Sequence, residues 1–387
     1  MGRFLQRGWV VLAAGAAMML FSGVPSAWGI FRKAACEEYG FSFEQSAMVL
    51  NLTVAAFGLG SVVGGWLQDK AGPRWCALLG SGLLASGFAA AALLPAGWVA
   101  AFYVGFCIPA GAGCVFLYPA VMTCAQRWYP QNKGLATGVP GVGFGLSGLA
   151  ITLIHRTAGD MWGLRGSFWA LAVLAVAVCG GGSLLLSLPP NAPVRPLEGM
   201  PPLQVLKSKS WRLLALAGAL AAPAVLLFSP RIVEMAQSHG AEAGAGWTVA
   251  LGAAANAAGR LAAPAAGDRL GCKRVQIGLL CVLAVLAAGF GWMQGWWFLA
   301  GYAGLCFCYS GQAALLPSFV TSLFGARWAG VNYGLAALGT SVGSVIFPLT
   351  VNALGGSELL CHAVACAAPL LGALCLWRLP NENLKNE

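Results

Sequence analysis

Two polar side chains stand four residues apart in an otherwise apolar stretch, and together they could bind an anion. Asn256 and Arg260 lie within residues 246–266. Residues four apart share one face of a helix, so we expect the amide to lie beside the guanidinium. A planar guanidinium holds a carboxylate through two parallel hydrogen bonds. No Asp or Glu occurs in the middle of an apolar stretch, so an anionic ligand could be the counter-ion of Arg260. The alternative is that the long Arg260 side chain extends to the nearer membrane edge.

The composition places this pair in a chain that is mostly apolar. Of the 387 residues, 59% are hydrophobic and 9% are charged, and the mean hydropathy is +0.76. A soluble domain carries about 25% charged residues, so this chain has too little polar surface for a water-soluble globule. The apolar content also excludes a disordered chain and favours one that lies largely in lipid.

Twelve apolar stretches are long enough to cross a bilayer, which takes about 20 residues. Their bounds are 8–31, 45–66, 75–94, 98–124, 134–155, 166–188, 211–233, 246–266, 274–292, 296–322, 330–353 and 358–378. The longest connection, residues 189–210, carries six prolines. We therefore predict an all-α integral membrane protein in which this linker joins two six-helix bundles, residues 1–188 and 211–387.

The cations indicate how the chain is oriented. With the N-terminus in the cytoplasm, 16 of the 22 Lys and Arg residues fall on the cytoplasmic side, five fall outside and Arg260 falls within a span. This asymmetry follows the positive-inside rule. We expect a multi-pass protein of the cell (inner) membrane with both termini in the cytoplasm. The net charge of +10 is then a topology signal and does not indicate nucleic-acid binding.

Other residue types that could carry chemistry are not arranged for it. The 13 Cys lie mostly in apolar runs without a CxxC pair, which is typical of packing residues, and the three His are not at metal-ligand spacing. The GxGxxG run Gly143–Gly148 lies inside an apolar stretch, where small residues favour close helix contact. The sequence has no phosphate-binding loop and no Ser/His/Asp grouping. We predict no enzyme, no metal and no cofactor.

The two halves repeat each other. The segment GWLQDKAGPR at 65–74 matches PAAGDRLGCKR at 264–274, with an offset of 199 residues. Pro119 and Pro317 are 198 apart, and Gly134 and Gly334 are 200 apart. Such a duplication is typical of secondary transporters that bind substrate between their halves. Ser61 is the counterpart of Arg260, so the guanidinium does not belong to the shared scaffold.

The repeated loop resembles the signature of the major facilitator superfamily, and the resemblance covers the whole chain. The second copy departs from it by having Pro264 where Gly is usual. The resemblance implies that charged loop residues pair with neighbouring helix ends when the cytoplasmic side is closed. In this sequence the gating residues would be Asp69, Lys70, Arg74, Asp268, Arg269 and Arg274. The alternative is that they only anchor the loops on the cytoplasmic side.

Further segments resemble the oxalate/formate antiporter family and the related monocarboxylate transporters. These are residues 127–138, the end of the first stretch at 26–31, residues 57–60 and residues 331–335. Those families place an Arg in the eighth helix, often with Asn or Asp four residues before it. Asn256 and Arg260 match this pattern. They also tend to have a Tyr ten residues before the loop Trp, as Tyr118 precedes Trp128. The resemblance implies that Tyr118, and less directly Tyr309, binds substrate; both could instead be packing residues.

One departure from the pattern of the oxalate/formate antiporter family narrows the expected class of substrate. A dicarboxylate carrier of that family would have a Lys in the eleventh helix. In this sequence the corresponding stretch, residues 330–353, contains no cation, and Leu338 stands at the position of that Lys. One buried cation balances one carboxylate, so we expect a secondary transporter of small organic anions, monocarboxylates above all, that acts as a monomer in the lipid bilayer. The coupling partner, a proton or a counter-anion, stays open. The alternatives are an exporter or permease for a neutral solute and a non-transporting membrane sensor.

Overall fold

The computed structural model describes residues 2–189, 198–241, 244 and 247–380. Within them the regular structure is helical, apart from one isolated antiparallel bridge between Gly199 and Gly325. Nine helical segments of this described part are long and apolar enough to cross a membrane. The prediction of an all-α fold with long apolar helices is therefore confirmed.

The chain divides into two units, and each contains a short segment from the other half of the sequence. Unit 1 consists of residues 1–131, 146–196 and 328–334, and unit 2 of residues 132–145, 197–327 and 335–387. The predicted division into residues 1–188, 189–210 and 211–387 stays a prediction, and part of that linker lies outside the described residues.

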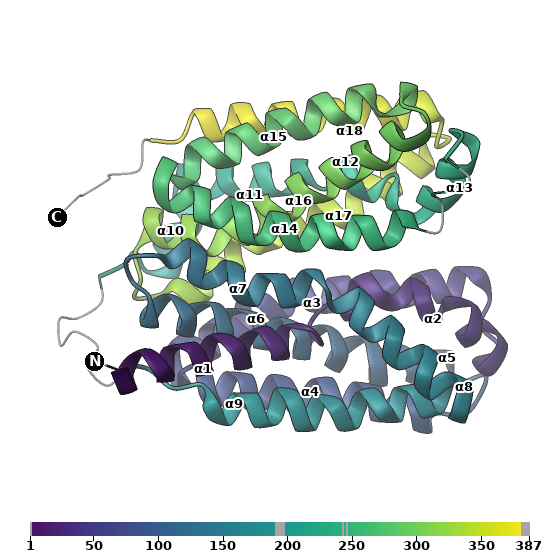
Figure 1. Cartoon of the computed structure of the whole chain (residues 1–387), viewed down its shortest axis with the longest axis horizontal. Helices are drawn as coiled ribbons and strands as arrows, with labels where there is room; N and C mark the ends of the chain where they lie inside the picture. The colour runs from purple at the N-terminus through teal and green to yellow at the C-terminus, as the bar shows by residue number, and fades with distance from the viewer. Residues whose placement is uncertain (1, 190–197, 242–243, 245–246, 381–387) are drawn as a thin grey trace. The chain divides into compact units, whose positions relative to one another are not determined.

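Unit 1 contains most helices of the first half (Figure 1). They are α1 (Gly2–Met19), α2 (Val24–Tyr39), α3 (Phe43–Ala71), α4 (Pro73–Leu93), α5 (Val99–Phe102), α6 (Ile108–Trp128), α8 (Ser147–Leu174) and α9 (Gly181–Leu185), with π-helical turns at Tyr103–Cys107 and Ala175–Gly180. Aromatic rings fill its core where α2, the π-helical turn Tyr103–Cys107 and α8 meet; the Trp28 ring lies 5.5 Å from that of Phe106, and the Phe31 ring lies 5.1 Å from that of Phe168.

Unit 2 contains one helix of the first half and most of the second. Its helices are α7 (Lys133–Gly145), α10 (Pro202–Lys207), α11 (Lys209–Ala221), α12 (Pro223–Leu226), α13 (Ile232–Ser238), α14 (Thr248–Leu270), α15 (Cys272–Gly289), α16 (Gly295–Phe324) and α18 (Glu358–Trp377), with short 3₁₀ turns at Ser229–Arg231 and Phe290–Trp292. Helix α17 (Ala329–Ala353) begins in unit 1 and continues in unit 2. In Figure 1 α7 lies alongside α14, against which it packs.

Two predicted spans are interrupted at matching positions of the repeat. The stretch 8–31 is divided by a turn at residues 20–23, and the stretch 211–233 is divided between α11 and α12. Pro25 and Pro223, 198 residues apart, stand at the start of the helices that follow. Proline lacks the N–H that a continuing helix needs, but it suits the first helical turn. The interruptions are therefore a further feature shared by the two halves.

Three other predicted spans differ from the nine apolar segments. Residues 133–185 form one segment that covers the predicted span 134–155 and most of the span 166–188. It has a break at Gly163, whose φ is 67°. Helix α14 covers most of the predicted span 246–266. It is not among the nine, because Asn256 and Arg260 reduce its apolarity. The candidate anion-binding residues thus lie on the least apolar of the predicted spans.

Candidate functional site

Helix α14 places Asn256 and Arg260 in direct contact. The Arg260 Nε–H donates a hydrogen bond to the Asn256 Oδ1 at 2.8 Å, as their spacing on one helix face allows. Only 7% of Arg260 is exposed. The backbone carbonyl of Asn256 accepts a second bond at 2.9 Å, from the Ser310 hydroxyl of α16. The backbone of the residue that holds Arg260 is thereby bonded to the neighbouring helix.

A residue that sequence reasoning missed, Phe144 of α7, completes the surroundings of the guanidinium. The Arg260 Cζ lies over the Phe144 ring, 4.3 Å from its centroid, which is within the range of a cation–π interaction. Phe144 precedes Arg260 by more than 100 residues in the sequence. Only the packing of α7 against α14 brings them together, so no spacing rule could have found this contact.

Glycines of α7 allow that close packing. A Cβ atom at Gly141 would lie 3.2 Å from the Arg260 Cβ, and one at Gly145 would lie 2.8 Å from the Ala257 Cα. Small residues let two helix backbones approach each other. Gly145 belongs to the GxGxxG run that we interpreted as a helix contact, whereas a Cβ at Gly148, at the end of that run, would meet open space.

The two terminal nitrogens of Arg260 remain available. Within the described residues Arg260 forms no ion pair, and its one hydrogen bond uses Nε. Tyr309 of α16 lies within electrostatic reach of the guanidinium. The arrangement offers one positive charge and two parallel donors.

Tyr118, the fourth predicted binding residue, belongs to the other unit. It lies in α6 of unit 1, where 3% of it is exposed. Its ring stacks on that of Tyr333, with 5.5 Å between the centroids and 16° between the planes. Asn256, Arg260 and Tyr309 belong to unit 2. Three of the four predicted residues therefore belong to unit 2, and Tyr118 belongs to unit 1.

Asp69 caps the N-terminus of α17. Its two carboxylate oxygens accept hydrogen bonds from Gly330 N at 3.0 Å and from Val331 N at 2.9 Å. The first N–H groups of a helix have no partner within the helix, and its N-terminus favours a negative charge. Arg127 lies close enough to Asp69 to act on it electrostatically. Asp69 thus joins α3 to a segment from the other half of the sequence.

Asp268 makes the corresponding contact at the end of α14. Its carboxylate accepts hydrogen bonds from Gly134 N, at 2.9 Å to each oxygen, and from Leu135 N at 3.1 Å. These N–H groups begin α7, which comes from the first half of the sequence. The two caps therefore follow the repeat, since each connects the end of one helix to the start of a helix from the opposite half.

The basic residues of the repeated loops make fewer contacts than the two aspartates. The Lys70 ammonium lies 4.9 Å from the centroid of the Trp66 ring. Arg74, Arg269 and Arg274 are exposed. Their positions fit both earlier interpretations, as gating residues or as anchors.

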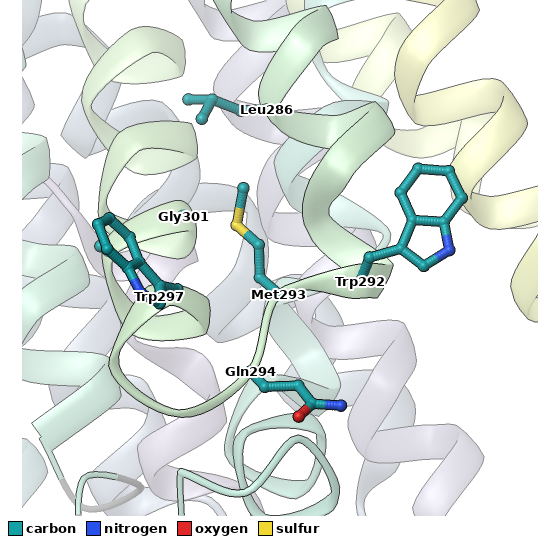
Figure 2. Close-up of a pocket in the computed structure, with 7 residues that line it drawn as sticks. Leu286, Trp292, Met293, Gln294, Trp297 and Gly301 are labelled. Atoms are coloured by element: carbon teal, nitrogen blue, oxygen red, sulfur yellow. The ribbon is translucent and has the colours of Figure 1, made fainter.

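A pocket of about 640 Å³ lies elsewhere in unit 2, at the turn between α15 and α16. Figure 2 shows Trp292 and Trp297 on either side of Met293, with Gln294 below them. None of the predicted binding residues lines this pocket. Trp is enriched where membrane spans meet the lipid headgroups, which accounts for these exposed rings. Among the residues that the structure describes, no group of three His, Cys, Asp or Glu side chains could hold a metal ion.

Comparison with known proteins identifies the class to which this fold belongs. The model of the Major Facilitator Superfamily matches residues 9–348, and the chain belongs to this superfamily of membrane transporters. The structure of the proton:xylose symporter XylE bound to 6-bromo-6-deoxy-D-glucose aligns with a TM-score of 0.71 over 97% of this chain and 96% of that chain, at 14% identity. The twelve-helix fold of two bundles is thereby confirmed, and the chain is not an enzyme.

Two relatives bear on the subgroup. Monocarboxylate transporter 11 of Mus musculus is 27% identical over 363 residues, which cover 88% of this chain and 79% of the relative. The oxalate:formate antiporter of Oxalobacter formigenes is 32% identical over 132 residues, which cover 33% of this chain and 30% of the relative. The resemblance to both families is therefore confirmed.

Proposed function

We propose that this chain is a secondary transporter that moves small monocarboxylates across the cell (inner) membrane by alternating access. The observation that carries the proposal is Arg260, which is buried, has no carboxylate partner in the described part of the chain and keeps two free nitrogens. A charge within a membrane protein costs several kcal/mol and usually faces a cavity or a partner. A substrate carboxylate would supply that partner.

The names of the relatives support the substrate class. One is called a monocarboxylate transporter and another an oxalate:formate antiporter. The absence of a cation from residues 330–353 favours substrates with a single carboxylate over dicarboxylates. Asn256 would hold Arg260 in place, and Tyr309 and Tyr118 would donate hydrogen bonds to the substrate.

The two aspartate caps support alternating access. Each cap joins segments from the two halves, so each must break when the halves separate on that side. In transporters built from repeats, the halves move against each other around the binding site. Asp69 and Asp268 would then bias the gate, with Lys70, Arg74, Arg269 and Arg274 beside them. We place this side, and both termini, in the cytoplasm because most cations lie there.

Uptake into proteoliposomes tests the proposal. Labelled pyruvate, lactate, formate and oxalate would be offered to the wild type and to Arg260→Ala, and Arg231→Ala, which removes an exposed cation, is the matched control. We expect saturable uptake of the monocarboxylates, loss of uptake in Arg260→Ala and no change in the control. Arg260→Lys should be impaired, since an ammonium cannot reproduce the two parallel hydrogen bonds. Anion uptake that persists in Arg260→Ala, or transport of a neutral solute that carboxylates do not inhibit, would contradict the proposal.

A further inference from the structure

Three contacts fix the orientation of the Arg260 guanidinium. Asn256 holds Nε at 2.8 Å, the Phe144 ring lies 4.3 Å from Cζ, and α7 packs closely beside the stem at Gly141. A guanidinium is flat and presents its five N–H groups along its edges. With Nε engaged and one face against the ring, the terminal edge formed by Nη1 and Nη2 is the part that a ligand can reach.

The chemistry of the Phe144 contact matters as much as its position. An aromatic face attracts a cation through its quadrupole and does not neutralise the charge. An Asp or Glu in the same place would occupy the donors of Arg260 and remove its net charge. Phe144 thus lowers the cost of burying the guanidinium while leaving its charge and its terminal donors to a ligand. A merely apolar side chain of similar size would supply the packing without this stabilisation.

We propose that Phe144 is a positioning and specificity residue of the anion site. Through a cation–π contact it presents the terminal edge of Arg260, so that the site takes a single carboxylate end-on, through Nη1 and Nη2. This inference rests on the proposed function, whose binding site it completes, and it assigns to the helix from the first half a direct part in recognition. The affinity of the site for a carboxylate then depends on the electron density of the ring at position 144.

A substitution series separates this role from packing. Labelled pyruvate uptake would be measured in proteoliposomes for Phe144→Tyr, Phe144→Trp and Phe144→Leu, with folding checked by size-exclusion chromatography. We expect Tyr and Trp to keep KM within about threefold of the wild type and Leu to raise KM about tenfold with little change in the maximal rate, as for the loss of a desolvated cation–π contact. If Phe144 only fills space, Leu is better tolerated than the larger Trp.

A second variant isolates the electronic effect. Replacing Phe144 by 3,4,5-trifluorophenylalanine keeps the shape of the ring nearly unchanged but withdraws electron density from its face. We expect KM to rise as much as in Phe144→Leu. An unchanged KM in the fluorinated protein, with a wild type that does transport pyruvate, would overturn the role of Phe144 and leave the proposed function standing. A wild type that takes up no carboxylate would instead overturn the proposed function.

Discussion

At the residue scale, the site is one buried cation whose neighbours are neutral. Asn256 accepts from Nε and Phe144 lies against Cζ, and neither cancels the charge. A guanidinium in low dielectric is costly unless hydrogen bonds and a counter-charge compensate for lost water. The described neighbours supply one hydrogen bond to Arg260 and no counter-charge. This incomplete compensation is what would make the site selective for an anion.

Removing the Asn256 amide should weaken substrate binding. In Asn256→Leu the Arg260 Nε loses a hydrogen bond to a charged group, which is worth about 1.5–3 kcal/mol, so we expect KM for pyruvate to rise at least tenfold. Proteoliposome uptake measures this. Asn352→Leu makes the same change at an exposed position and should leave KM unaltered. A wild-type KM in Asn256→Leu would show that the hydrogen bond does not position Arg260.

The contrast between Asn256 and Phe144 shows how much of the site the sequence could reveal. Asn256 was predictable because its relation to Arg260 is local, four residues along one helix. Phe144 was not, because its contact depends on how α7 packs against α14. Tyr118 was predicted by resemblance, which preserves a position in the chain but does not specify the neighbours. In the structure that position lies beside Tyr333.

At the element scale, two features govern the helix ends and the helix contacts. Carboxylates from α3 and α14 cap the starts of α17 and α7, and glycines of α7 let that helix approach α14. The repeated loops predicted where the aspartates lie. They did not predict which N–H groups the carboxylates accept from, since those groups are about 130 or more residues away in the sequence.

Removing a cap should lower the stability of this conformation. In Asp69→Ala the first N–H groups of α17 lose their acceptors, and a cap of this kind contributes about 1 kcal/mol, more where charge assists. We expect a lower melting temperature in detergent, a smaller decrease in Asp69→Asn, and no change in Asp160→Asn, whose side chain is exposed. Equal melting temperatures for the Asp69→Ala protein and the wild type would mean that this cap does not stabilise the fold.

Crowding α7 should disturb the site at a distance. In Gly145→Ala the new Cβ would lie 2.8 Å from the Ala257 Cα, so the helices must separate and the neighbouring Phe144 must shift from Arg260. We expect a lower melting temperature and a higher KM for pyruvate. Gly148→Ala, where the added methyl meets open space, should be neutral or slightly stabilising. If both variants behave alike, close packing at Gly145 is unimportant.

At the scale of the whole molecule, the internal repeat accounts for the fold and Arg260 breaks the repeat. The spans, the loop signatures and the prolines Pro119 and Pro317 recur about 199 residues apart, so the fold could be predicted from the sequence. The interruptions at Pro25 and Pro223 were missed, because an apolar run looks the same whether its helix is continuous or broken. The break at Gly163 falls in the connection that was predicted between residues 155 and 166. Arg260 has Ser61 as its counterpart, and function is expected where duplicated halves differ.

The most direct test of the account is a calorimetric titration of the purified protein with pyruvate. Binding is predicted to be saturable in the wild type, to be lost in Arg260→Ala and to be retained in Arg231→Ala. Wild-type protein that releases no heat with any short monocarboxylate, or Arg260→Ala protein that binds as tightly as the wild type, would contradict the claim that this guanidinium receives an organic anion.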